Sequence, residues 1–170
     1  TICSFVVGAF IMYSLIATSN KGILVQKVTS ENIKTTTVEE ISDLKNAIND
    51  VYETSVYIEV ASNRGMIASG SGFVYKEDSK YGYILTNYHV IEGGNKFFIT
   101  FTDGSEHEAE YVNGDEYYDI AVLKTPIENI KKIATLGDSS NLELGDSVFT
   151  VGAPLGKEYM GTVTKGIISG

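Results

Sequence analysis

Short runs in which apolar and polar side chains alternate dominate the chain from Ser55 onward, and this period of two constrains the fold most. β-Branched and aromatic residues fill these runs, and turn-forming pairs such as Asp103-Gly104 and Asn113-Gly114 separate them. The pattern predicts six strands, over residues 55–60, 72–77, 81–91, 96–104, 106–114 and 119–125. Six strands that follow one another as a meander can close into a barrel and leave no edge exposed. We therefore predict an all-β barrel over residues 53–132.

The stretch after this barrel predicts the start of a second domain. Residues 133–170 open with turn-rich segments, and two further alternating runs follow at 147–154 and 161–169. These runs predict a hairpin with no following sheet. A hairpin without a covering layer leaves apolar side chains in contact with water, so we expect partial exposure of Val148, Phe149, Val151, Ile167 and Ile168.

The first 52 residues predict an anchor, a linker and a helix. Residues 2–17 form an uncharged run of sixteen residues, slightly short of the roughly 17 to 25 residues of a membrane-spanning helix. We expect residues before Thr1 to complete it, so that 1–17 is an anchor; a cleavable signal peptide is the alternative, although Leu15-Ile16-Ala17 matches a cleavage site poorly. Polar residues 18–37 predict a linker. Over 38–52, an amphipathic helix is predicted by apolar residues spaced three and four apart, namely Val38, Ile41, Leu44, Ile48 and Val51.

Composition excludes several functions. The net charge of -9, from 22 acidic and 13 basic residues, opposes attraction to nucleic acid, so we predict no nucleic-acid partner. The single cysteine, Cys3, rules out an intramolecular disulfide, and with two histidines no Cys/His metal cluster can be built. We predict neither a metal nor an organic cofactor.

His89 and Asp119 are the residues that this sequence offers for proton-transfer chemistry. His89 stands where the apolar strand 81–91 ends, although a histidine in such a place is more often structural. Asp119 leads an apolar strand and is predicted to be drawn into the interior; closing the preceding turn is an equally good explanation of it. His107, expected to be a solvated hairpin residue, and Asp115, the alternative acid, are less favoured.

A histidine and a buried aspartate have complementary chemical roles. The aspartate accepts a hydrogen bond from Nδ1–H, and Nε2 is then free to take a proton from a nucleophile. The 30 positions between His89 and Asp119 allow the two to come from different strands and meet at the rim of one barrel.

Six blocks in the same order and at similar spacing resemble those of the HtrA/Deg family of trypsin-like serine proteases. The resemblance extends from about Ser55 to Gly170, and the blocks are Gly70-Ser71-Gly72-Phe73-Val74, Leu85-Thr86-Asn87-Tyr88-His89-Val90, Thr102-Asp103-Gly104, Asp119-Ile120-Ala121-Val122-Leu123-Lys124, Leu136-Gly137-Asp138-Ser139 with Leu144-Gly145-Asp146, and Val151-Gly152-Ala153-Pro154-Leu155-Gly156. It implies a chymotrypsin-like fold in which 53–132 is the N-terminal barrel and 133–170 begins the second barrel. It also implies that His89 and Asp119 are the catalytic histidine and aspartate.

The family's Gly-Asn-Ser-Gly-Gly block, which holds the nucleophile, has no counterpart in these 170 residues. Ser169 lies in what resembles the preceding strand, so we expect the serine beyond Gly170 and predict that this fragment is inactive while the intact protein is an endopeptidase. The resemblance further implies unfolded protein substrates, a trimer, and a protease domain held outside the cytoplasm by the membrane anchor.

Two alternatives remain open on the sequence. One is a non-catalytic binding or sensing pseudoprotease on the same fold, which retention of both His89 and Asp119 disfavours. The other is a chymotrypsin-like protease whose nucleophile is cysteine. The residues that follow Gly170 would distinguish them.

Overall fold

The computed structural model describes residues 44–154 and 156–169. The predicted anchor 1–17, the linker 18–37 and the first part of the predicted helix lie outside the described residues. Residues 44–52 are helical, and the helix is amphipathic because Leu44, Ala47 and Ile48 are partly buried while Lys45 and Asn49 are exposed. No helix within the described ranges has both the length and the apolar character needed to cross a membrane.

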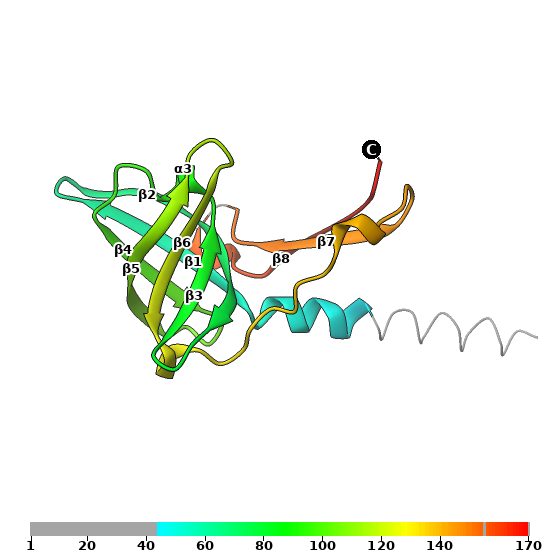
Figure 1. Ribbon diagram of the computed structural model, residues 1–170, viewed down its shortest axis with the longest axis horizontal. Coiled ribbons are helices and arrows are strands. Elements are labelled where there is room, and N and C mark those ends of the chain that lie inside the picture. The colour runs from blue at the N-terminus through cyan, green and yellow to red at the C-terminus, as the bar shows by residue number, and fades with distance from the viewer. Residues whose placement is uncertain (1–43, 155, 170) are drawn as a thin grey trace, which may run out of the picture. The chain divides into compact units, whose positions relative to one another are not determined.

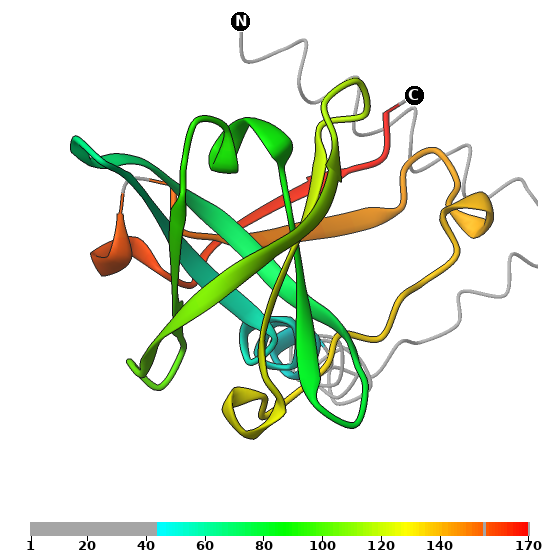
Figure 2. The same cartoon turned by 60° about the vertical axis from the view of Figure 1, so that its left-hand side comes forward.

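Six antiparallel strands form a closed barrel in the order β1-β2-β3-β6-β5-β4 (Figures 1 and 2). The pairing of β1 with both β2 and β4 closes the ring, so no edge of this sheet is left unpaired. The predicted all-β barrel is therefore confirmed. The strands are β1 Ser55–Ser62, β2 Gly65–Glu77, β3 Tyr81–Thr86, β4 Lys96–Phe101, β5 Glu106–Asp115 and β6 Ile120–Pro126.

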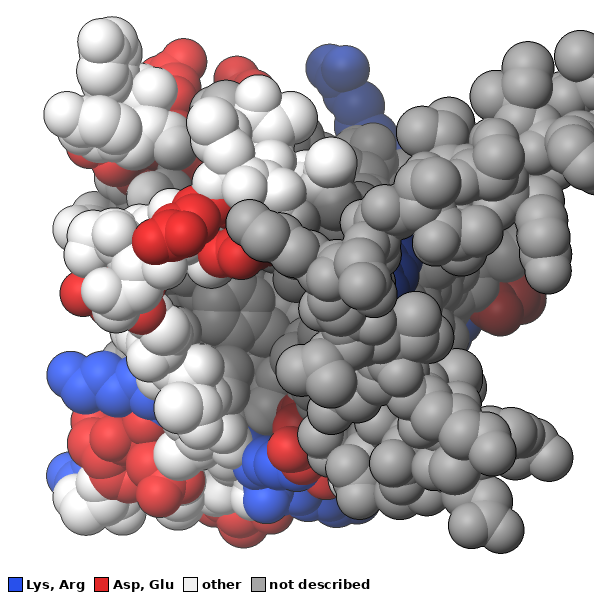
Figure 3. Space-filling model, turned by 90° about the vertical axis from the view of Figure 1, so that its right-hand side faces the viewer, with Lys and Arg blue, Asp and Glu red and all other residues white. Residues whose placement is uncertain are grey.

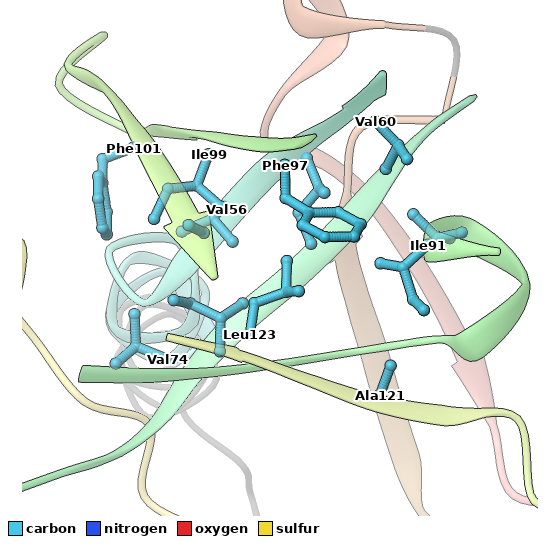
Figure 4. Close-up of a cluster of buried hydrophobic side chains, with 13 residues drawn as sticks. Val56, Val60, Val74, Ile91, Phe97, Ile99, Phe101, Ala121 and Leu123 are labelled. Atoms are coloured by element: carbon cyan, nitrogen blue, oxygen red, sulfur yellow. The ribbon is translucent and has the colours of Figure 1, made fainter. Parts of the chain in front are cut away.

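The prediction that the strands pair as a meander is wrong. β3 pairs with β6 and not with β4. After Thr86 the predicted strand 81–91 gives way to the short helix α3, Tyr88–Ile91, and the chain then crosses to β4 beside β1. Val90 and Ile91 are 7% and 6% exposed, so α3 buries two apolar side chains, and Figure 4 shows Ile91 close to Phe97 and Val60.

One of the two predicted turns is a turn and the other is not. At Asp103-Gly104 the glycine has a φ of 82°, and the Asp103 carboxylate accepts from the Ser105 amide at 2.9 Å. Asn113-Gly114 instead lies inside β5, beside a bulge between Tyr111 and Asn113 in the pairing with β6. Such bulges bend a strand and help a sheet to close.

The barrel interior is filled by alternate residues of the strands (Figure 4). Ile58, Ile84, Ile99 and Leu123 come from four different strands and are all 0% exposed. Each such side chain contributes about 1.5 to 3 kcal/mol through burial. The full cluster comprises Val56, Ile58, Val60, Val74, Ile84, Val90, Ile91, Phe97, Ile99, Phe101, Ala109, Ala121 and Leu123.

A separate two-stranded sheet follows, in which β7, Ser147–Gly152, pairs antiparallel with β8, Thr162–Ile167. Short 3-10 turns occupy η1 Ile127–Asn129, η2 Ser139–Asn141 and η3 Lys157–Tyr159. The expected exposure is present: Ile167 is 63% exposed, and Val148, Phe149, Val151 and Ile168 are partly exposed.

Candidate active site

His89 is held on α3 at one end of the barrel. The helix follows β3 directly, and its buried residues Val90 and Ile91 fix it to the core. The His89 side chain is 68% exposed. The imidazole is thus presented to solvent from a short helix whose backbone is anchored.

Asp119 stands between the turn after β5 and the first residue of β6. Its φ of 53° is the single positive value among the described non-glycine residues; aspartate tolerates this left-handed region better than most side chains. The Asp119 amide donates to the Glu116 carbonyl at 3.3 Å, which closes the turn. The turn-closing explanation of Asp119 and the functional one are therefore compatible.

The pairing of β3 with β6 brings the two residues together. Thr86 lies opposite Ala121 in this ladder, so the residues that follow β3 meet those that precede β6. His89 Nδ1 lies 2.8 Å from Asp119 Oδ2. The His89 backbone amide donates to Asp119 Oδ1 at 2.9 Å, so both carboxylate oxygens contact the same histidine.

Asn87 is a third member of the site, which sequence analysis did not single out. Its side-chain amide donates to Asp119 Oδ2 and to the Asp119 carbonyl, each at 3.2 Å. A polar residue at the end of an apolar strand, two positions before the candidate histidine, was the available signal. Because Asn87 binds both the carboxylate and the backbone carbonyl of Asp119, it helps to orient the carboxylate.

Hydrogen bonding lowers the pKa of the Asp119 carboxyl group. The His89 backbone amide, then the His89 side chain, hold the pKa of Asp119 below its ordinary 3.8, against an opposing contribution from burial. The prediction of a buried aspartate is wrong, since its side chain is 43% exposed. The reason is its position in an exposed turn and not within the strand.

The two less favoured residues lie elsewhere. His107 pairs with Ile99 on β4 and packs edge-on against Phe101, with ring centroids 5.8 Å apart, so it is partly buried and not the solvated residue that was expected. Asp115 accepts from the Tyr118 amide at 2.9 Å and so stabilises the turn.

A hydrogen-bonded path links the site to the second sheet. The Thr86 hydroxyl donates to the Ser71 carbonyl at 2.9 Å. The Ser71 hydroxyl in turn accepts from the Ala153 amide, also at 2.9 Å, and Lys157 forms an ion pair with Glu106 at 3.1 Å. These contacts hold the end of β7 and the following turn against the barrel.

A cavity of about 770 Å³ opens beside the carboxylate. Asn87, Asp119 and Ile120 line it from the barrel, and Ala47 and Val51 line it from the helix. His89 is not among the lining residues, so the cavity adjoins the pair on the side of Asp119.

The arrangement of His89 and Asp119 is suited to general-base chemistry at Nε2 of His89. An Nδ1–H that donates to Asp119 leaves Nε2 unprotonated and able to accept a proton, and the carboxylate stabilises the imidazolium that results. A hydroxyl or thiol placed at Nε2 would therefore be activated.

Comparisons with known proteins identify the family of this chain. Residues 70–170 match the model of the trypsin-like peptidase domain. The chain belongs to the HtrA family of trypsin-like peptidases. The closed six-stranded barrel and the short helix fit the chymotrypsin-like fold of this family.

Individual HtrA relatives span much more sequence than this chain. It is 37% identical over 159 residues to the serine protease Do-like HtrB of Bacillus subtilis, covering 85% of this chain and 35% of HtrB. It is 45% identical over 100 residues to a probable periplasmic serine endoprotease of Halomonas elongata, described as DegP-like, covering 59% of this chain and 20% of the relative. The solved HtrA-type protease AlgW with a tripeptide superposes with a TM-score of 0.66 at 32% identity, over 74% of this chain and 39% of AlgW.

Proposed function

We propose that the protein to which this chain belongs is a serine endopeptidase in which His89 is the general base and then the general acid, and Asp119 orients it. The observation that carries the proposal is the two-point contact of one carboxylate with one histidine, at 2.8 Å to Nδ1 and 2.9 Å from the backbone amide. The contact with the backbone amide places the carboxylate relative to α3, and the contact with Nδ1 then orients the imidazole, which general-base catalysis requires. HtrA membership supports the same chemistry.

The roles follow from the triad mechanism. His89 Nε2 takes the proton of a serine hydroxyl as that oxygen attacks the peptide carbonyl, and later gives the proton to the leaving amine. Asp119 remains ionised throughout, which the direction of its pKa shift favours. The serine and its oxyanion-hole amides are proposed to lie after Gly170, because the Gly-Asn-Ser-Gly-Gly block is not within these 170 residues.

Substrates, assembly and location are further parts of the proposal. We infer that the intact protein cleaves unfolded polypeptides outside the cytoplasm. The similarity to probable periplasmic serine endoproteases supports this location. The uncharged run 2–17 supports a membrane anchor, and family membership supports a trimer.

A peptidase assay on unfolded casein tests the proposal. The longer protein, extended through the Gly-x-Ser-Gly-Gly block, is expected to cleave casein, and the 170-residue chain is expected to be inactive. His89→Ala in the longer protein should lower kcat by roughly a thousandfold or more, whereas His107→Ala serves as the matched control. Cleavage that survives His89→Ala would refute the assignment, and an inactive longer protein with an intact serine would favour the pseudoprotease.

A further inference from the structure

Two exposed tyrosines stand immediately beside the His89–Asp119 pair. Tyr117 and Tyr118, in the turn between β5 and β6, are 88% and 70% exposed. Their rings form an edge-to-face pair with centroids 5.1 Å apart and planes at 88°. Asp119 follows Tyr118 directly, and Ile120 is itself 45% exposed. Large aromatic surface left open to water next to a reactive pair is typical of a binding surface.

The charged side chains of the segment that carries these tyrosines are all acidic. No lysine or arginine occurs between Lys96 and Lys124, a span that holds seven carboxylates. Three of the seven pair with lysines, namely Asp103 with Lys131, Glu106 with Lys157 and Glu110 with Lys124. Within the described part of the chain, Asp115 and Glu116, which directly precede Tyr117, form no ion pair with lysine or arginine.

Figure 3 shows how charged side chains are spread over one face of the molecule. In its lower part blue side chains lie beside red ones, a further blue side chain projects at the top, and red groups at the upper left lie beside white surface. Local repulsion among unpaired carboxylates favours the approach of a cation.

We propose that Asp115, Glu116, Tyr117 and Tyr118, here called the acidic tyrosine patch, dock a basic, extended segment of a polypeptide substrate. This inference rests on the proposed peptidase function and names a substrate class for it. A lysine or arginine over a tyrosine face gains a cation–π interaction and a nearby carboxylate at once. A purely apolar segment would instead desolvate Asp115 and Glu116 without pairing them.

The molecule already contains contacts of this kind at other tyrosines. The Lys124 ammonium lies 4.4 Å from the centre of the Tyr81 ring, and that of Lys76 lies 5.8 Å from the centre of Tyr83. Tyr118 is additionally held by the hydrogen bond from its amide to Asp115. The patch therefore offers a cation a largely preorganised surface, which reduces the entropic cost of binding.

Binding is measured by fluorescence anisotropy on the 170-residue chain. The probe is a fluorescein-labelled peptide, Gly-Lys-Ala-Lys-Val-Lys-Ala-Lys-Gly, and its matched partner has glutamine at each lysine. We expect the lysine peptide to bind at least about tenfold more tightly, with an affinity that falls as salt rises from about 0.05 to 0.5 M.

Substitutions locate the site. The double variant Tyr117→Ser/Tyr118→Ser should weaken binding of the lysine peptide about 4- to 25-fold, and Glu116→Gln about 2- to 5-fold. Tyr117→Leu/Tyr118→Leu keeps apolar surface but removes both ring faces, so it should weaken binding as well. The matched controls are Tyr159→Ser, an exposed tyrosine on η3, and Glu77→Gln, an exposed acid at the end of β2, and both should bind normally.

Equal affinity for the two peptides would overturn the inference, and so would undiminished binding by both tyrosine double variants. Because no cleavage is required, this failure is distinguishable from failure of the proposed function. A longer protein that loses casein cleavage on His89→Ala but binds neither peptide refutes the patch alone. Peptide binding by a longer protein whose cleavage does not depend on His89 refutes the function and leaves a docking surface.

Discussion

Replacing Asp119 by asparagine is expected to change the tautomer of His89 while leaving the fold intact. The carboxylate faces two groups of the same residue: the His89 amide, which can only donate, lies against Oδ1, and Nδ1 lies against Oδ2. An asparagine has one oxygen and one NH₂ group. If its oxygen faces the His89 amide, its NH₂ group faces Nδ1; the reverse orientation would set the NH₂ group against the backbone N–H.

Each orientation sets the NH₂ group against one donor, which is the Asn87 side-chain amide in the first orientation and the His89 backbone amide in the second. The first orientation is favoured because the exposed Asn87 side chain can turn away, whereas the backbone amide of His89 is fixed in α3. Nδ1 must then accept a hydrogen bond, so the proton of the neutral imidazole moves to Nε2. A protonated Nε2 cannot take a proton from the nucleophile. In the longer protein we expect kcat to fall about 10⁴-fold, the loss that the same change causes in the serine-protease triad.

Two measurements check this reasoning. Nitrogen NMR of the histidine-labelled 170-residue chain at about pH 9, above the ordinary histidine pKa of roughly 6.5, reports which ring nitrogen carries the proton. Casein cleavage by the longer protein reports the rate. Asp138→Asn is the matched control, because hydrogen bonds from Ser140 also lower the pKa of Asp138 but no histidine is involved. An unchanged His89 tautomer in Asp119→Asn, or activity within about tenfold of the parent protein, would contradict the mechanism.

Three further predictions concern stability. Leu123→Ala empties a fully buried position and should lower the free energy of unfolding by about 2 to 5 kcal/mol, measured by urea titration, while Leu136→Ala, at a residue 64% exposed, should change it by less than about 0.5 kcal/mol. Gly82→Ala would set a Cβ 2.1 Å from Ile130 Cγ1 and should cost about 1 to 3 kcal/mol; the double variant with Ile130→Ala should be more stable than the sum of the two single effects predicts, and strict additivity would argue against the clash. The pKa of Asp78 is lowered to about 2, chiefly by the hydrogen bond from Tyr83. Its ionised form therefore stabilises the fold at pH values above the ordinary 3.8 and this contribution is lost as pH falls toward 2, so Asp78→Asn should unfold more readily than the parent chain near neutral pH and equally readily near pH 2.

The strands themselves could be predicted from sequence because alternation of side chains is a local property. A buried face requires an apolar residue at every second position, and Val56, Ile58 and Val60 satisfy this in β1. His89 and Asp119 could also be chosen as candidates from the sequence, since a histidine at the end of one apolar strand and an aspartate at the start of another are visible in the chain.

Local sequence did not predict which strands become neighbours. The pairing of β3 with β6 joins segments far apart along the chain and depends on how the whole ring closes, and the meander prediction failed for that reason. The same limit applies to Asn113-Gly114, which is a favourable turn pair but lies within β5 because pairing with β6 continues through it.

Sequence alone thus determined the alternating strands and their apolar faces, and it supplied His89 and Asp119 as the candidate site residues. Tertiary structure decided that β3 lies beside β6, and with it that the His89 imidazole lies 2.8 Å from the Asp119 carboxylate, with Asn87 against the same oxygen. It also decided that this carboxylate is half exposed in a left-handed turn. The physical reason is that side-chain periodicity follows from local burial, whereas strand order and the exposure of a turn follow from contacts between distant parts of the chain.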